Sequence, residues 1–281
     1  MPRALLLVVL SAALTAADPY TKHPLGSTPA PYGYLQHLPP KMAKGKHYPL
    51  VFFLHGLGEL GDSSTQLDAV AKNGPFRHLA KNDAIAKRID QEGAILIGPQ
   101  GIKADKWWQT PKLIQTLDHV CQTLPVDPDR VYVTGLSMGG GGTWALITAK
   151  APMIAAAIPV CPAAKAGKVD PIKDLPIWAH HAIGDGVVKF PENTQGWFDA
   201  LLAARGAKPA GGVLNGYTRN DQPQFASLLA SGWAWQSGTS PTPATASTLM
   251  LTVYPDQSHD SWGRAYSNPI VWDWLFAQKR R

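Results

Sequence analysis

The sequence predicts an α/β protein whose central sheet is mostly parallel and is covered by helices on both faces. Short apolar runs, typical of strands buried on both faces, alternate along the chain with longer segments of helical periodicity. The clearest run is 49–54, which reads Pro-Leu-Val-Phe-Phe-Leu. Such alternation is typical of parallel sheets, because two parallel neighbours need a crossover long enough to hold a helix.

The remaining elements follow from the same two patterns, and with 45% hydrophobic residues the chain can build a large core. Residues 18–31 are rich in Pro, Thr and Gly and are expected to be irregular. The expected strands are an edge strand at 32–38 and buried strands at 49–54, 94–97, 130–134, 154–160, 175–183 and 249–254. The expected helices are 66–72, 76–87, 111–124, 140–150, 192–205 and 268–279. We expect residues 18–281 to form one domain.

One long segment, 208–247, does not fit the alternation. It is rich in Gly, Pro, Ser and Thr, and a connection of this length between a helix and a strand is unusual. Within it, 225–235 is expected to form one short helix. The segment starts at the end of the sheet opposite to where α/β proteins bind ligands, so we expect a decorating insertion. A substrate-binding role requires that it wrap to the other end.

The first seventeen residues have the organisation of a secretory signal peptide. A basic start, Met1-Pro2-Arg3, precedes an apolar run over 4–14 and the small residues Thr15-Ala16-Ala17. The run is shorter than the roughly 20 residues that span a bilayer, and no Cys follows it to carry a lipid anchor. We therefore expect the mature chain to begin near Asp18 and to be secreted or periplasmic, without a membrane anchor.

The distribution of charge argues against nucleic-acid binding, and the two cysteines bear on whether the chain forms a disulfide. The net charge is +6, but the basic residues are scattered apart from 279–281, and no aromatic-basic array is present. We therefore exclude a nucleic-acid-binding protein, whereas the charge is compatible with acidic polysaccharide surroundings. Ten tryptophans suggest that some line a pocket. Cys121 and Cys161 are expected on opposite sides of the sheet, as free thiols.

The motif Gly135-Leu136-Ser137-Met138-Gly139 lies between the expected strand 130–134 and the expected helix 140–150. A serine on a sharp turn between a strand and a helix is the arrangement of a nucleophile elbow. The flanking glycines have a physical reason, since strand and helix approach each other too closely for a Cβ. Glycines 139–142 do not form a phosphate-binding loop, because no Lys-Ser or Lys-Thr follows in the required place.

Two further strand ends supply the partners that a serine nucleophile needs. Asp185 follows the strand at 175–183, and His259 follows the last strand. The histidine would accept the proton of Ser137, and the carboxylate would orient the imidazole. The competing acids are expected to have other roles: Asp170, Asp174 and Asp199 lie elsewhere in the fold, and Asp256 and Asp260 cap loops or lie at the surface. His55 is expected to be structural. Of His180 and His181, at least one is expected to be a core residue.

A tetrahedral oxyanion needs hydrogen-bond donors that are placed in advance. We expect them to be the backbone N–H of Met138, the residue after the nucleophile, and that of Leu57, with Gly58 as the next choice. Trp108, Glu59 and Trp262 are expected to contact substrate. No metal or cofactor is expected.

Taken together, four motifs resemble the phospholipase/carboxylesterase family: His55-Gly56-x-Gly58-Glu59-x-Gly61, Gly135-x-Ser137-x-Gly139-Gly140, His181-x-x-Gly184-Asp185-x-Val187-Val188 and His259-Asp260-Ser261-Trp262. The chain is most similar to secreted esterases labelled predicted peptidases, which are related to dienelactone hydrolases, feruloyl esterases and polyester depolymerases. The likeness covers nearly all of the mature chain outside 208–247. Ala182 departs from the family, which usually has Gly after this histidine.

The resemblance implies an α/β-hydrolase fold, no cofactor and a triad of Ser137, Asp185 and His259. The expected function is hydrolysis of carboxylic esters, either small or borne on a polymer, for example acetyl or feruloyl esters on polysaccharide. A serine peptidase and a polyester depolymerase are the alternatives. A catalytically inactive binding protein would require a broken triad, and all three members are present.

Overall fold

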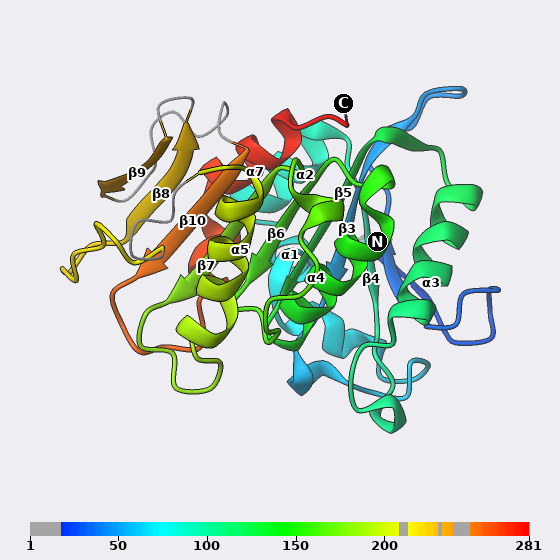
Figure 1. Ribbon diagram of the computed structural model, residues 1–281. Helices are drawn as coiled ribbons and strands as arrows, with labels where there is room; N and C mark the ends of the chain where they lie inside the picture. The colour runs from blue at the N-terminus through cyan, green and yellow to red at the C-terminus, as the bar shows by residue number, and fades with distance from the viewer. Residues whose placement is uncertain (1–17, 208–212, 230–231, 239–247, 281) are drawn as a thin grey trace, which may run out of the picture.

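The computed structural model describes residues 18–207, 213–229, 232–238 and 248–280, so the expected signal peptide, 1–17, lies outside the described residues. The described chain forms a ten-stranded sheet in the order β1-β2-β4-β3-β5-β6-β7-β10-β8-β9. Strands β4, β3, β5, β6, β7 and β10 are mutually parallel, and antiparallel strands extend the sheet at both ends (Figure 1). The predicted fold class is confirmed.

The strands are β1 (Thr21–His23), β2 (Tyr34–His37), β3 (Tyr48–Leu54), β4 (Ile95–Pro99), β5 (Val126–Leu136), β6 (Ala156–Val160), β7 (Ile177–Ala182), β8 (Gln224–Leu229), β9 (Gly232–Ser237) and β10 (Leu249–Tyr254). The α-helices are α1 (Gly74–Lys81), α2 (Ala84–Glu92), α3 (Thr110–Thr123), α4 (Met138–Lys150), α5 (Gly196–Ala204), α6 (Trp262–Ser267) and α7 (Pro269–Ala277). Shorter turns include the 3₁₀ segments η1 (Leu57–Glu59) and η2 (Leu67–Lys72), and the π-helical segment η6 (Pro191–Gln195) before α5.

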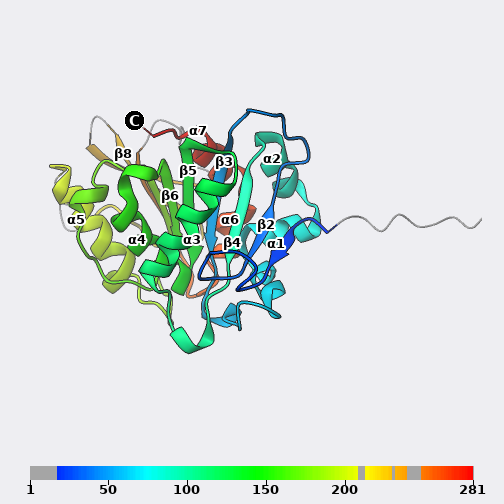
Figure 2. The same ribbon diagram turned by 90° about the vertical axis from the view of Figure 1, so that its right-hand side faces the viewer.

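The helices form a layer on each side of the sheet, as Figure 2 shows from the side. Helices α3, α4 and α5 pack on one face and bury an aromatic pair, Trp144 against Trp197, with ring centroids 4.4 Å apart. Helices α1, α2, α6 and α7 pack on the other face around Phe53, Phe76 and Trp272. Strand β3 is buried along its whole length, which explains its unbroken apolar sequence.

Several expected boundaries differ from the structure for identifiable local reasons. The expected helix 76–87 is two helices, because Asn82 adopts a left-handed conformation (φ +50°) and the Asp83 side chain caps α2. The segment at 66–72 is 3₁₀-helical, and α6 was not expected. Residues 18–31 contain the short strand β1, which pairs with β2, so the strand near 32–38 is not an edge strand.

The expectation of a helix at 225–235 is wrong. This stretch forms β8 and β9, an antiparallel pair that continues the sheet beyond β10. Trp233 and Trp235 alternate with smaller neighbours and pack against Phe198 and Tyr217, which is the two-residue period of a strand. A short apolar run can fit either period, and here the open edge of β10 decides between them.

The segment 213–223 lies at the end of the sheet where the parallel strands finish. Gln224, the first residue of β8, pairs with Val253 near the carboxyl end of β10. The loop before it and the loop after β10 together line a cavity of about 450 Å³, between residues such as Arg219, Asp256 and Arg264. Part of the insertion therefore does wrap to the end of the sheet where ligands bind in α/β proteins.

Both cysteines are free thiols, as expected. Burial raises the pKa of the Cys121 thiol to about 11 and raises that of Cys161 further. Within the described residues, none of the helices combines the length and the apolar character needed to cross a membrane.

Candidate active site

Ser137 sits on a strained turn between β5 and α4. Its backbone has φ +53° and ψ −119°, a conformation that non-glycine residues rarely adopt. A Cβ on Gly139 would overlap the carbonyl oxygen of Leu54, and one on Gly135 would overlap that of Gly139. The two glycines of the motif are therefore required by the close approach of strand and helix, as expected from the sequence.

The structure brings together the three residues that the sequence predicts as a triad. Nε2 of His259 lies 2.9 Å from Oγ of Ser137, and Nδ1 of His259 lies 2.7 Å from Oδ2 of Asp185. The three residues follow β5, β7 and β10, whose carboxyl ends meet at one end of the sheet. The hydroxyl, the imidazole and the carboxylate thus form one hydrogen-bonded line.

The carboxylate of Asp185 is buried and fully hydrogen-bonded. Oδ1 accepts the backbone N–H groups of Val187 and Val188 at 2.8 and 2.9 Å, and Oδ2 accepts from His259 and from Nε2 of His181. Burial by itself would raise the pKa of Asp185, but these hydrogen bonds outweigh it and hold the pKa well below its usual range. Asp185 is therefore ionised at any pH at which the protein is expected to work.

The two expected oxyanion donors begin helices. Leu57 is the first residue of η1 and Met138 is the first residue of α4, and N–H groups at the start of a helix have no partner within it. Gly56, next to Leu57, packs against Ser137: a Cβ on Gly56 would lie 3.6 Å from the Cβ of Ser137. The start of η1 and the start of α4 therefore both lie beside the serine.

Comparisons with known proteins find similarity to esterases. The model of the Esterase family matches residues 26–152. Feruloyl esterase D of Neurospora crassa is 26% identical over 185 residues, which cover 64% of this chain and 61% of that protein. A thermostable esterase of known structure superposes with a TM-score of 0.66 at 23% identity, over 94% of this chain and 64% of its own. The chain therefore has the α/β-hydrolase fold.

The chain spans about three fifths of the curated relative that it matches, and slightly more of the thermostable esterase. A dienelactone hydrolase from Klebsiella pneumoniae subsp. pneumoniae also matches, with a TM-score of 0.45 at 19% identity over 66% of this chain and 81% of that one.

His55 holds the loop that carries Leu57. Its Nδ1 donates to the carbonyl of Gly56 at 2.6 Å, and its Nε2 accepts the N–H of Gly101 at 2.9 Å. Complete burial lowers the pKa of His55 to about 4, so the ring is neutral near pH 7. With both nitrogens bonded to backbone, His55 has a structural role and no proton to exchange.

The three residues expected to contact substrate are buried or hydrogen-bonded within the protein. Trp108 is only 4% exposed and donates to the carbonyl of His55, so it lies beneath the site and not on its surface. Glu59 is 6% exposed and accepts from Nδ2 of Asn73 at 2.9 Å. Trp262 donates to Oδ1 of Asn73 and packs edge-on against the His259 ring, with centroids 5.3 Å apart. Asn73, which the sequence analysis did not identify, thus links Glu59 to Trp262, and Trp262 in turn packs against His259.

Three exposed apolar side chains lie next to the catalytic residues. Six large apolar side chains are strongly exposed among the described residues, and three of them, Leu57, Trp107 and Val187, follow β3, β4 and β7 at this end of the sheet. Their exposed fractions are 60%, 43% and 73%. Each adjoins the site: Leu57 follows Gly56, Val187 donates its N–H to Asp185, and the Trp107 ring lies against Gly141 in the first turns of α4. We call these three residues the apolar rim.

Three of the acids expected to be structural, Asp256, Asp260 and Asp199, have partners away from the triad. Asp256 forms an ion pair with Arg264 and accepts the N–H of Ser258, and Asp260 accepts the N–H of Gly263. Asp199 accepts the N–H of Val213. Among the residues that the structure describes, no group of three His, Cys, Asp or Glu side chains is placed to hold a metal ion.

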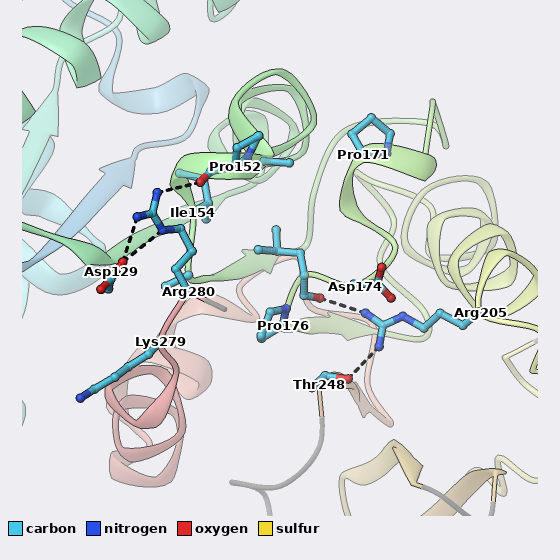
Figure 3. Close-up of a pocket in the computed structure, with 13 residues that line it drawn as sticks. Asp129, Pro152, Ile154, Pro171, Asp174, Pro176, Arg205, Thr248, Lys279 and Arg280 are labelled. Carbon is cyan, nitrogen blue, oxygen red and sulfur yellow. Dashed lines mark hydrogen bonds and ion pairs between the residues drawn. The ribbon is translucent and has the colours of Figure 1, made fainter.

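A cavity of about 780 Å³ lies at the opposite end of the sheet, where β6, β7 and β10 begin (Figure 3). Two of the cations at its wall already have partners. Arg280 bonds to Asp129 and to the carbonyl of Pro152, and Arg205 bonds to Thr248 and to the carbonyl of Leu175. Because open α/β sheets bind ligands beyond the carboxyl ends of their strands, we assign this cavity no role in the chemistry.

Proposed function

We propose that the protein is a serine hydrolase that cleaves carboxylic esters through an acyl-enzyme on Ser137. The observation that supports this most directly is the unbroken line from Oγ of Ser137 through His259 to Asp185, with contacts of 2.9 and 2.7 Å. A hydroxyl at this distance from an imidazole has a base within reach, which is what a weak nucleophile requires.

The proposed steps use each group once in each half-reaction. Nε2 of His259 takes the Ser137 proton as Oγ attacks the ester carbonyl, and Asp185 stabilises the imidazolium that forms. The N–H groups of Leu57 and Met138 bind the oxyanion. His259 then protonates the leaving alcohol, and a water molecule hydrolyses the acyl-enzyme by the same route.

Parallel assays on an acyl ester and on an amide with the same acyl group test this function against peptide hydrolysis. We expect turnover of the ester and none of the amide. An enzyme that cleaved the amide faster than the ester would be a peptidase, and the proposal would be wrong. Intact-mass measurement after brief mixing with the ester is expected to find one acyl group, and peptide mapping is expected to locate it on Ser137.

The likeness to a feruloyl esterase favours acetyl or feruloyl esters on polysaccharide as substrates. A second candidate, a polyester, is favoured by the apolar rim, because exposed apolar side chains around the nucleophile suit an extended apolar surface. Assays on short-chain, feruloyl, acetyl-xylan and polyester substrates would rank these possibilities.

Replacing two rim residues, as Trp107→Ser with Val187→Ser, is expected to test the polyester candidate. Loss of this apolar area should lower hydrolysis of a polyester film about tenfold more than that of a soluble short-chain ester. Leu38→Ser is the matched control, since Leu38 is also exposed but follows β2 at the other end of the sheet. An equal effect of the rim and control variants on the film would remove the polyester candidate.

We further propose that residues 1–17 direct export and that the mature chain starts near Asp18, acting as an extracytoplasmic enzyme on small or polymer-borne esters. The basic, apolar and small-residue pattern of this segment supports the proposal. Mass spectrometry of the protein from a secreting host is expected to find a new N-terminus at or beside Asp18. Retention of the full chain inside the cells would contradict export.

A further inference from the structure

We propose that His181, next to the triad, positions Asp185, the carboxylate that orients His259. This inference rests on the proposed hydrolase function. His181 lies in β7, four residues before Asp185, and its side chain is completely buried. His181 belongs to the motif His181-x-x-Gly184-Asp185-x-Val187-Val188, but the sequence predicts only that at least one of His180 and His181 is a core residue.

The hydrogen bonds of His181 determine where its proton lies. Nε2 is 3.2 Å from Oδ2 of Asp185 and 2.9 Å from the carbonyl oxygen of Val188. Both neighbours only accept hydrogen bonds, so Nε2 must carry a hydrogen whatever the protonation state of the ring. Nδ1 contacts the hydroxyl of Thr194 in η6 at 2.7 Å, which fixes the other side of the ring.

The bond from His181 ends on the carboxylate oxygen that His259 uses. Oδ2 of Asp185 receives Nδ1–H of His259 at 2.7 Å and Nε2–H of His181 at 3.2 Å, while both backbone N–H donors go to Oδ1. The same Nε2–H is shared with the carbonyl oxygen of Val188 at 2.9 Å, so it ties Oδ2 to the backbone of the loop that carries Asp185, independently of His259. It holds the plane of the carboxylate while the His259 ring changes its charge during turnover.

The shared oxygen also has an electrostatic consequence. A second donor on Oδ2 withdraws part of the negative charge that stabilises the His259 imidazolium. Asp185 and His259 are the titratable groups that the structure places in this hydrogen-bonded cluster with His181. Removing the donor is thus expected to loosen Asp185 and, with it, the orientation of the His259 ring, whereas replacing a residue that only fills space would change neither.

Two variants of similar length separate these roles. His181→Met removes the donor and keeps an apolar side chain of comparable size, whereas His181→Gln can place an amide N–H near the position of Nε2. For His181→Met we expect kcat to fall roughly tenfold to a hundredfold with KM little changed, since one hydrogen bond to a charged group is lost. His181→Gln should recover most of kcat, because its amide N–H can replace the lost donor.

Equal kcat in the folded Met and Gln variants would overturn the proposal. If His181→Met does not fold, Thr194→Val provides the test, because it removes only the hydroxyl that fixes Nδ1. That variant is expected to lower kcat several-fold without changing KM, and wild-type kcat in it would count against the positioning role. The wild-type ester assay separates the two proposals: without ester turnover the hydrolase function fails, whereas turnover unaffected by His181 removes only this inference.

Discussion

Replacing Ser137 with alanine is expected to lower kcat for ester hydrolysis about a millionfold, as loss of a triad serine does in other hydrolases. Without Oγ no acyl-enzyme can form, and His259 has no hydroxyl to deprotonate. The fold should be unaffected. Alanine must adopt the same positive φ as serine, and the hydroxyl that is lost has His259 as its partner.

The measurement is steady-state kinetics on a chromogenic ester, together with a thermal melt of each protein. Ser27→Ala is a suitable control, because that hydroxyl bonds to the carbonyl of Pro24 at the surface and lies outside the site. We expect the control to keep wild-type kinetics and both variants to keep the wild-type melting temperature. Turnover that persisted in purified Ser137→Ala protein at a rate near that of the wild type would rule out Ser137 as the nucleophile.

Much of the candidate site was predictable because its residues are tied to sequence-local features. Ser137 lies in a strand–turn–helix motif, and Asp185 and His259 come directly after buried apolar runs. In a parallel sheet the carboxyl ends of the strands all lie at one edge of the sheet, so residues that directly follow different strands are expected to lie near one another. The close approach of backbone at Gly135 and Gly139 follows from the same turn.

What could not be predicted depends on contacts between distant segments. Asn73, just before α1, meets Trp262, the first residue of α6, only because the two helices pack together, and no local sequence pattern identifies Asn73. Trp107 and Trp108 are adjacent and chemically identical, yet the fold exposes Trp107 and buries Trp108. The prediction that Trp108 contacts substrate therefore chose the buried member of the pair. The strands β8 and β9 form because β10 offers an open edge, which a short apolar run does not reveal.

Asp185→Asn is expected to lower kcat about 10⁴-fold while leaving the fold intact, because it reverses the hydrogen bond that orients the histidine. The reversal follows from the contacts of the carboxylate. Both backbone N–H donors point at Oδ1, so the amide oxygen of an asparagine must occupy that position, and its NH₂ must replace Oδ2. That NH₂ then faces Nδ1 of His259, which has to accept instead of donate.

A histidine that accepts at Nδ1 carries its hydrogen on Nε2, the nitrogen that faces Ser137, and it can no longer take the serine proton. Kinetics of Asp185→Asn against Asp260→Asn measure this, since Asp260 accepts the N–H of Gly263 in the first turn of α6 and does not bond to the histidine ring. We expect the control to stay within a few-fold of wild-type kcat. Near-wild-type turnover in Asp185→Asn would transfer the orienting role to another carboxylate. A loss equal in both variants would point to the loop around His259, and not to the hydrogen bond at Nδ1.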